Sequence, residues 1–394
     1  MTDNPDIKIK NLIIKNFRAI DELNYSPKKI NILIGKNNTG KSTILRAISF
    51  LFHGPFGFQL QPGIFGPTFG PTNITSPSFI YEVKDDKSKA QIISDSDEVI
   101  IYKNYESVDP ADKEIIIRSL YKTLELAFSS DNKDKIQNAI NLFFNFFNYS
   151  ISINKEKKAI VRPYLRNPDE LQKFFNEINK VFSPQQPPPS FGIFIQWIYG
   201  LPTSPEGFPH FKDFKNVFFL THELKCSRTI FANEKELFAL EEFSKENDLL
   251  PNLDRLTPTS VVTIDSNGER HIIPYILYGE GFIVLLNTLY YLLKAENGIV
   301  LIEEPENHLH PGFLTVFIET IFKYSEKLNI QIFMTSHSTD LIEDVISYAK
   351  SEGKENDILF SLLVKKNNLI EKIDYDFKKA DRYSNELKLD LRGP

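Results

Sequence analysis

The sequence predicts an α/β fold, with a mainly parallel sheet flanked by helices and a large, mainly helical insertion. Short apolar runs that fit strands alternate with helix-spaced apolar positions near both ends of the 394-residue chain. Such alternation implies a parallel sheet covered by helices. Two stretches rich in Gly or Pro bound the middle of the chain, where helix patterns dominate. We therefore expect residues 1–79 and 213–394 to form two parts of one head, with 80–212 as an insertion or lid.

The composition is that of an ordinary globular protein. Hydrophobic residues make up 41% and charged residues 25% of the chain, so apolar material for a core is ample. The net charge of −6 means that a nucleic-acid site would have to be a local basic patch. The chain has one cysteine, no apolar run of membrane-spanning length, and an acidic N-terminus that is not a secretory signal. We expect a cytoplasmic protein without a disulfide framework or membrane contact.

The N-terminal part is predicted to contain two strands and a helix. Residues 7–14 begin by alternating between apolar and polar, and residues 30–34 are nearly all apolar, as expected of a buried strand. Apolar residues at helical spacing predict a helix over 41–52. The next stretch, 54–78, contains ten Gly or Pro among its 25 residues and is predicted to be a loop.

The insertion is predicted to hold helices ahead of a proline-rich segment at 183–190. The helix patterns cover 112–128, 133–148 and 168–182. An aromatic run at 142–149 could stack on nucleic-acid bases. A place in the core of the insertion or at an interface is the favoured interpretation of this run.

Strand and helix patterns alternate again from residue 213 onwards. An Asn-Gly turn at Asn267 and Gly268 separates two short apolar runs and predicts a hairpin. The predicted strands are 216–220, 261–264, 271–273, 299–302 and 330–335, and the predicted helices are 282–295, 312–325 and 339–350.

Residues 35–43 match the pattern G-x-x-x-x-G-K-[ST] of a phosphate-binding loop, between a predicted strand and a predicted helix. Glycines let backbone N–H groups curve around a phosphate, and the helix N-terminus favours its negative charge. Lys41 would reach the β- and γ-phosphates, and Ser42 would bind Mg²⁺. The chain is therefore predicted to be a P-loop NTPase. Its nucleotide-binding loop consists of Gly35, Lys36, Asn37, Asn38, Thr39, Gly40, Lys41, Ser42 and Thr43.

Carboxylates stand at the end of the apolar strand predicted at 299–302. Glu303 would hold Mg²⁺ through water, and Glu304 would orient and deprotonate the water that attacks the γ-phosphate. A solvated acidic strand end is the alternative, and the P-loop makes it less favoured. Glu306 follows close behind, and its role stays open between the site and surface charge.

His337 follows the predicted strand 330–335. A histidine at the C-terminal edge of a strand is well placed to contact a γ-phosphate in an open α/β sheet. The alternative is a histidine that local hydroxyl groups cap. The two preceding motifs favour the functional interpretation, in which His337 belongs to the catalytic site.

A second pair of glycines precedes the predicted helix 282–295. Glycines before a helix expose N–H groups that bind anions. Because the P-loop already serves the chain's own nucleotide, we expect this segment to contact the nucleotide of a partner across a dimer. An ordinary tight turn is the alternative. The segment consists of Tyr278, Gly279, Glu280 and Gly281.

His308 and His310 lie near Glu306 and could suggest a metal site. Their spacing lacks a third or fourth well-placed ligand. Polar residues at the end of a loop are therefore the favoured interpretation.

The order of these motifs resembles the ATPase head of ABC-type proteins. Within this group the chain is most similar to the OLD-like and abortive-infection-like AAA ATPases, relatives of the RecF and SMC proteins. The similarity covers about 1–50 and 215–345. It is carried by the P-loop, by Gly-Glu-Gly at 279–281, by Leu-Ile-Glu-Glu-Pro-Glu at 301–306, by His-Leu-His-Pro at 308–311 and by Thr-Ser-His-Ser at 335–338.

The resemblance implies that Lys41, Ser42, Glu303, Glu304 and His337 take the roles given above. It also implies that 279–281 complete the site of the other protomer and that Asn307 falls at a dimer-facing D-loop. The Leu-Ser-Gly-Gly-Gln signature of transporters is absent, which argues against a transporter subunit. Only 57 residues follow His337, too few for the Toprim domain of OLD nucleases, so we expect no nuclease activity. The Q-loop glutamine stays open between Gln59, Gln61 and Gln91.

The expected function is an ATPase that works as an ATP-gated homodimer, with ATP and Mg²⁺ as cofactors, in DNA maintenance, repair or defence against foreign DNA. DNA and a separate nuclease or effector protein are the candidate partners. Any DNA contact would depend on local lysines, for example Lys8, Lys10 and Lys15 or Lys155, Lys157 and Lys158. The alternative is an ATP-bound switch or scaffold of low turnover that regulates a nuclease or toxin partner.

Overall fold

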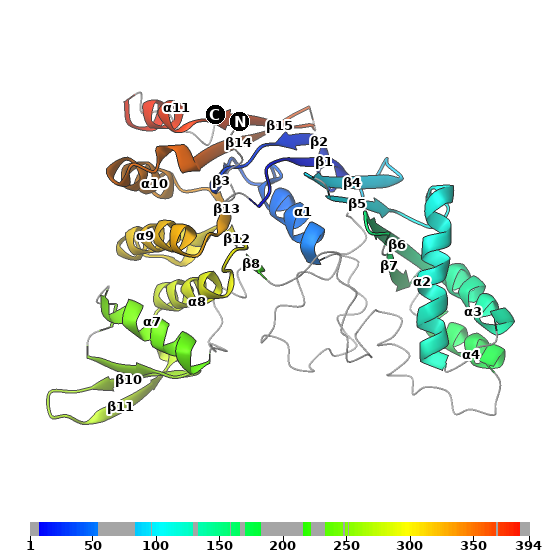
Figure 1. Ribbon diagram of the computed structural model, residues 1–394, viewed down its shortest axis with the longest axis horizontal. Coiled ribbons are helices and arrows are strands. Elements are labelled where there is room, and N and C mark those ends of the chain that lie inside the picture. Colours follow the sequence, from blue (N-terminus) through cyan, green and yellow to red (C-terminus); the bar gives the residue numbers. More distant parts are fainter. Residues whose placement is uncertain are drawn as a thin grey trace.

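In the computed structural model, a sheet with helices on both faces forms the centre of the molecule, as Figure 1 shows. The predicted loop at 54–78 and the proline-rich segment at 183–190 lie outside the residues that the structure describes. These are 8–53, 83–95, 97–128, 133–157, 159–165, 170–182, 216–221, 233–246, 249–250, 252–367 and 369–386.

The central sheet has six strands in the order β15-β14-β3-β13-β12-β8. Neighbouring strands from β14 to β8 are parallel, and β15 is antiparallel to β14 at the edge. The prediction of a mainly parallel sheet is therefore confirmed. The strands are β3 (Ile30–Ile34), β8 (Val217–Leu220), β12 (Ile299–Glu303), β13 (Gln331–Ser336), β14 (Ile358–Lys366) and β15 (Leu369–Tyr375).

Alternate side chains of this sheet enter two hydrophobic cores. On β12, Val300 and Ile302 face one core, whereas Ile299 and Leu301 face the other, as the two-residue period of a strand requires. Figure 1 shows α8, α9 and α10 on one side of the sheet and α1 on the opposite side. Burial on both faces explains why β3 and β12 are almost uninterrupted apolar runs. The helices are α1 (Lys41–His53), α8 (Glu280–Lys294), α9 (Pro311–Lys327) and α10 (Thr339–Glu352).

A second sheet is antiparallel and links the N-terminal part to the expected insertion. Its order is β2-β1-β4-β5-β6-β7, and β1 pairs with β2 on one side and with β4 on the other. Strands from the expected insertion 80–212 thus continue a sheet that begins near the N-terminus. The strands are β1 (Leu12–Phe17), β2 (Ile20–Tyr25), β4 (Lys89–Ser94), β5 (Asp97–Tyr102), β6 (Phe147–Asn154) and β7 (Ala159–Leu165).

The helices of the insertion form a core of their own. Phe143 is buried in it, Phe144 stacks on Tyr105 with ring centroids 4.4 Å apart, and Phe146 lies 5.4 Å from Phe174. The core interpretation of the aromatic run is confirmed for Phe143, Phe144 and Phe146. The helices are α2 (Pro110–Phe128), α3 (Lys133–Phe146) and α4 (Glu170–Phe182).

The predicted hairpin is present and belongs to a third, small sheet. β10 (Ser260–Ile264) pairs with β11 (Arg270–Pro274), and β9 (Leu253–Leu256) adds a strand on the other side. The sequence patterns did not reveal α7 (Glu234–Glu246), β9, β14, β15 or α11 (Phe377–Asp381). No helix in the described part of the chain combines the length and the apolar character that a membrane span requires.

Candidate active site at the P-loop

The P-loop backbone takes conformations that glycine adopts most easily. Gly35 has a φ of 138° and Gly40 a φ of 93°, both in the positive region. A Cβ atom on Gly35 would collide with the carbonyl oxygen of Leu363 in β14, and one on Gly40 would lie 2.6 Å from Ile370 in β15. The hairpin of β14 and β15, which the sequence patterns missed, therefore packs directly against the P-loop and supports its shape.

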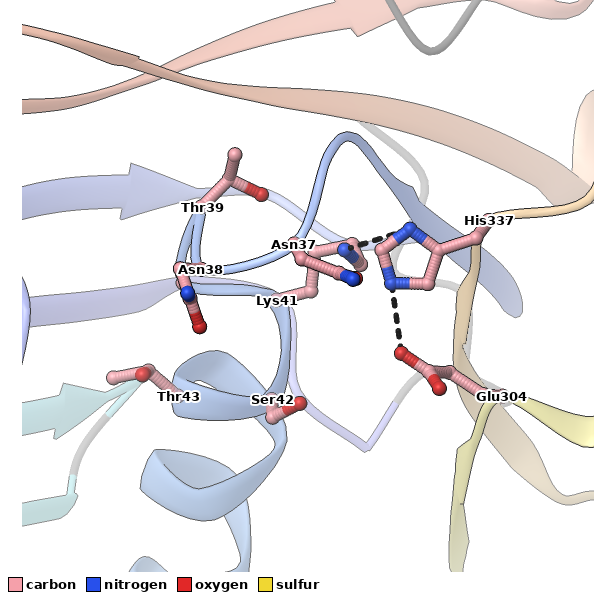
Figure 2. Close-up of a pocket in the computed structure, with 9 residues that line it drawn as sticks. Asn37, Asn38, Thr39, Lys41, Ser42, Thr43, Glu304 and His337 are labelled. Atoms are coloured by element: carbon pink, nitrogen blue, oxygen red, sulfur yellow. Dashed lines mark hydrogen bonds and ion pairs between the residues drawn. The ribbon is translucent and has the colours of Figure 1, made fainter.

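A cavity of about 330 Å³ lies over this loop, at the C-terminal ends of β3, β12 and β13. Open α/β sheets bind ligands at this edge. Figure 2 shows the P-loop residues on one side of the cavity and His337 and Glu304 on the other. The structure thus brings together most of the residues predicted for the nucleotide site. The cavity is lined by Asn37, Asn38, Thr39, Gly40, Lys41, Ser42, Thr43, Glu304 and His337.

Lys41 is the first residue of α1 and is only 4% exposed. Its Nζ atom donates hydrogen bonds to the carbonyl oxygens of Gly35 at 2.8 Å and Lys36 at 2.9 Å. Burial lowers the pKa of Lys41 to about 8, although the charges of nearby carboxylates, Glu304 first among them, oppose this shift. A phosphate would offer this ammonium group charged acceptors, which make stronger hydrogen bonds than carbonyls do.

His337 stands between Lys41 and Glu304. Its Nδ1 atom lies 3.4 Å from Nζ of Lys41, and its Nε2 atom lies 2.7 Å from Oε1 of Glu304. A protonated lysine can only donate, so Nδ1 acts as the acceptor and the Nε2–H group donates to Glu304. The dashed lines in Figure 2 follow this chain from the lysine to the carboxylate.

The backbone at Glu304 turns sharply at the end of β12. Glu304 has a φ of 46° and precedes Pro305, the first residue of the 3₁₀ helix η5 (Pro305–His308). Its N–H group lies 3.1 Å from both the carbonyl and the hydroxyl oxygen of Thr335 in β13. Asn307 donates to the second carboxylate oxygen at 2.8 Å. The Glu304 carboxylate is therefore held by a histidine and an amide, while 28% of the side chain stays accessible to solvent.

The two residues predicted to hold Mg²⁺ occupy different places. Ser42 lines the cavity, whereas Glu303, the last residue of β12, does not. The charge of Glu303 is still close enough to raise the pKa of Lys41. A hydroxyl and a carboxylate are the hard oxygen donors that magnesium prefers, so the residues present fit a magnesium ion that arrives with the nucleotide.

The segment from Tyr278 to Gly281, here called the signature segment, does not line the cavity of its own chain. Gly279 is the N-cap of α8, and among the described residues no atom beyond its two chain neighbours lies within 4 Å of the place where its Cβ would be. Gly281 is packed, because its Cβ would lie 3.2 Å from the His308 carbonyl oxygen. Glu280 contacts His308 at 3.1 Å, which ties α8 to η5. The role of this segment at a partner's nucleotide stays a prediction.

Glu306, whose role the sequence left open, lies behind His337. Its Oε1 atom accepts a hydrogen bond of 2.8 Å from the Ser336 hydroxyl group and one of 2.7 Å from the His337 N–H group. The N–H group of Ser338 adds a third at 3.2 Å. A turn that exposes successive N–H groups after a strand needs an acceptor, but no local pattern in the sequence identifies Glu306 as that acceptor.

The remaining candidates have structural contacts. His310 caps α9, its Nδ1 atom accepting from the Gly312 N–H group at 3.4 Å. Among the described residues, His308 and His310 belong to no group of convergent metal ligands, and their interpretation as polar loop residues stays a prediction. Gln91 donates to Glu98 at 3.0 Å and does not line the cavity. Gln59 and Gln61 lie outside the described residues.

Comparison with known proteins decides the family. Residues 30–343 match the model of the family described as "AAA domain, putative AbiEii toxin, Type IV TA system". The chain belongs to this family. The match spans the P-loop, Glu303 and Glu304 at the end of β12, and His337, so the chain is an ATP-binding and ATP-hydrolysing protein of the AAA/ABC P-loop type.

Two relatives and one solved structure illustrate what this AAA protein is similar to. It is 22% identical to an "ATP/GTP phosphatase" of Helicobacter pylori over 363 residues, which cover 85% of this chain and 86% of the relative. It is 32% identical over 117 residues to an uncharacterized protein of Methanocaldococcus jannaschii, which cover 29% of this chain and 99% of the relative. The SMC head domain from Thermotoga maritima aligns with a TM-score of 0.44 and 11% identity, covering 94% of this chain and 99% of that chain.

Proposed function

We propose that this AAA protein works as an ATP-gated homodimer. The observation that supports the proposal is the separation, within one chain, of the P-loop cavity from the signature segment, whose Gly279 stands open at the start of α8. In a dimer with twofold symmetry, each exposed helix N-terminus could cover the phosphates bound by the other P-loop. ATP would then hold the two heads together, and hydrolysis would release them.

In the proposed reaction, the chain's own residues bind the phosphates and move one proton. Lys41 exchanges the carbonyl oxygens of Gly35 and Lys36 for β- and γ-phosphate oxygens. Glu304 accepts the proton of the attacking water, and His337 contacts the γ-phosphate. Mg²⁺, held by Ser42 and through water by Glu303, would supply charge neutralisation at the β- and γ-phosphate oxygens.

The biological role that we propose is defence against foreign DNA, or DNA maintenance, in the cytoplasm and with a separate effector protein. The family description, with its AbiEii toxin and its type IV TA system, supports an effector partner. The motif order supports an OLD-like branch of the family. Lys15, one of the lysines considered for DNA contact, forms an ion pair with Glu22 at 3.4 Å. With a net charge of −6 the chain has no overall basic field, so a protein partner is favoured over direct DNA binding.

A second candidate function is an ATP-bound switch of low turnover. It is favoured by the hydrogen bonds that already engage the carboxylate of Glu304, the group expected to activate water. Both oxygens of Glu304 are engaged, one by His337 and the other by Asn307. If these contacts persist after ATP binds, the protein would hold ATP and signal its presence without rapid hydrolysis.

Turnover measured with and without DNA, together with the molecular mass in solution, tests these proposals. The ATP-gated dimer predicts that a Glu304→Gln variant becomes dimeric in ATP and stays monomeric in ADP by light scattering. A monomer at saturating ATP would refute the dimer. A dimer whose wild-type form hydrolyses ATP slowly, with or without DNA, would favour the switch. Affinity capture of Glu304→Gln from its native host in ATP would then identify the partner.

A further inference from the structure

One carboxylate oxygen holds the turn that carries His337. Oε1 of Glu306 accepts hydrogen bonds from three consecutive residues, Ser336, His337 and Ser338, at 2.8, 2.7 and 3.2 Å. Hydrogen bonds to a charged acceptor are stronger than those to a neutral one. The other oxygen, Oε2, is buried and has no hydrogen-bond partner within the described part of the chain. The interaction of Glu306 with this turn is therefore concentrated on Oε1.

The path of the backbone explains how Glu306 reaches this turn. The left-handed conformation of Glu304, with a φ of 46°, and the following Pro305 bend the chain at the end of β12. The bend directs Glu306 across to the end of the neighbouring strand β13, where α10 begins. Ser338 caps that helix by accepting from the Leu341 N–H group at 3.3 Å. The Glu306 carboxylate thus joins the end of β13 to the start of α10.

We propose that Glu306 is a positioning residue for ATP hydrolysis, which fixes the backbone of His337 so that the imidazole stays between Lys41 and Glu304. Glu306 does not line the cavity, so it acts on the reaction through His337. This inference rests on the proposed role of His337. It adds that this role requires the His337 backbone to be held in one position, and that Glu306 is the residue that holds it. The bond of 2.7 Å from the His337 N–H group is its most direct support.

A double-mutant cycle separates this role from a merely structural one. ATP turnover of the full chain is measured for the wild type, Glu306→Ala, His337→Ala and the double variant. If Glu306 acts through His337, Glu306→Ala should lower kcat on the order of ten- to a hundredfold in the wild type. In the His337→Ala background it should lower kcat less than about twofold. The KM for ATP should stay within about threefold in Glu306→Ala, because the P-loop is intact.

Two further variants control for folding. Glu306→Gln keeps an acceptor oxygen at the same reach and should retain turnover within about fivefold of the wild type. Glu343→Ala removes an exposed carboxylate from α10, the helix that follows the turn, and should leave turnover unchanged. Melting temperatures of all variants show whether a loss of turnover follows a loss of folded protein. If Glu306→Ala does not fold, Glu306→Gln replaces it in the cycle, and its smaller loss should likewise vanish in the His337→Ala background.

Each outcome of the cycle supports or overturns a specific statement. An equal loss from the Glu306 substitution in both backgrounds would overturn the positioning role and leave the proposed function intact. A Glu306→Gln variant as inactive as Glu306→Ala, but equally stable, would also overturn it, because position without charge would then be insufficient. Wild-type turnover in His337→Ala would instead refute the proposed role of His337, and this inference with it.

Discussion

The Nε2 atom of His337 lies 2.7 Å from Oε1 of Glu304. His337, which is expected to contact the γ-phosphate, is thus hydrogen-bonded to Glu304, which is expected to activate water. Lys41 joins the same chain through Nδ1, at 3.4 Å. Because one imidazole contacts both partners, a nucleotide that draws Lys41 away changes the hydrogen bonding of Glu304 as well. The contact therefore offers a way for phosphate binding to change the state of the Glu304 carboxylate.

The first prediction concerns Glu304. Replacing it with Gln removes the proton acceptor but keeps the size of the side chain and its ability to accept from Asn307. We expect ATP to bind with an affinity within about threefold of the wild type, and turnover to fall on the order of a hundredfold or more. Nucleotide binding is measured by calorimetry and turnover by phosphate release.

A matched control for this change is Glu319→Gln, which alters an exposed carboxylate on α9 and should leave turnover unchanged. If Glu304→Gln hydrolyses ATP at the wild-type rate, Glu304 does not activate the water. Glu306 would then be the next carboxylate to test, since it contacts the turn that carries His337.

The second prediction concerns the pH dependence of ATP binding. Burial lowers the pKa of Lys41 to about 8 in the nucleotide-free protein, so the side chain loses its charge as the pH rises through this value. The phosphates of ATP favour the charged form of Lys41. Above pH 8, ATP binding must therefore be accompanied by the uptake of one proton by Lys41. The Kd for ATP should therefore rise up to about tenfold per pH unit above pH 8 and change little below it.

Lys41→Arg provides the control, because a guanidinium group stays protonated throughout this range. Its ATP affinity at pH 7.5 is expected to be weaker, since the fork of an arginine does not fit contacts built for a single ammonium group. Its Kd should nevertheless be flat between about pH 7.5 and 9.5. An equal rise of Kd in wild type and Lys41→Arg would show that another group titrates.

The third prediction concerns the shape of the P-loop. Gly35→Ala places a Cβ against the Leu363 carbonyl oxygen at a φ of 138°. We expect the free energy of unfolding to fall by about 1–3 kcal/mol and ATP affinity to fall at least about tenfold, because the loop must move away from β14. Gly279→Ala, at a φ of −62° with open space around it, should change the unfolding free energy by less than about 0.5 kcal/mol. A Gly35→Ala variant as stable as Gly279→Ala would contradict this account.

The sequence predicted those strands and helices whose pattern of apolar and polar residues matches their burial in the folded protein. β3 and β12 are buried on both faces and are apolar except for Asn31 and the terminal Glu303, so their assignment needed no tertiary information. β14 is equally apolar over its first six residues and could have been found by the same criterion. In β15, at the sheet edge, only Ile370 is buried, and the strand pattern of its sequence is weak. Its contact with Gly40 depends on tertiary packing, which no local pattern reports.

The candidate site likewise contains residues that the sequence revealed and one residue whose role it did not reveal. Lys41, Ser42 and Glu304 stand in motifs whose spacing alone states their chemistry, and the structure places all three at one cavity. Glu306 is different, because its three donors lie at least 30 residues away in sequence. Only the pairing of β12 with β13 brings them together. The sequence could therefore name the groups that face the cavity, but not the one that holds His337 from behind.

The last prediction tests the shared site of the proposed dimer by mixing two inactive variants. Lys41→Ala loses the phosphate contact of its own P-loop. Gly279→Asp places a carboxylate where the signature segment would meet the partner's γ-phosphate, a contact between like charges. Gly279 is the better choice than Gly281, because Gly279 has open space around it and Gly281 is packed against His308. The expected defect of Gly279→Asp is therefore one of function and not of folding.

Each variant alone should be inactive, and the mixture should recover activity. In a mixed dimer, one site combines the P-loop of the Lys41→Ala chain with the signature segment of the Gly279→Asp chain and has both defects. The other site combines the two unchanged parts and has neither defect. Random exchange of subunits makes about half of the dimers mixed, so turnover should reach roughly a quarter of the wild-type value if the sites act independently. A mixture of Lys41→Ala with Gly279→Ala controls for the charge of the new side chain, and it should reach about half of the wild-type turnover whether or not subunits exchange. If the mixture stays inactive while Glu304→Gln is monomeric in ATP, the partner's nucleotide is not the ligand of the signature segment, and Gly279 simply starts α8.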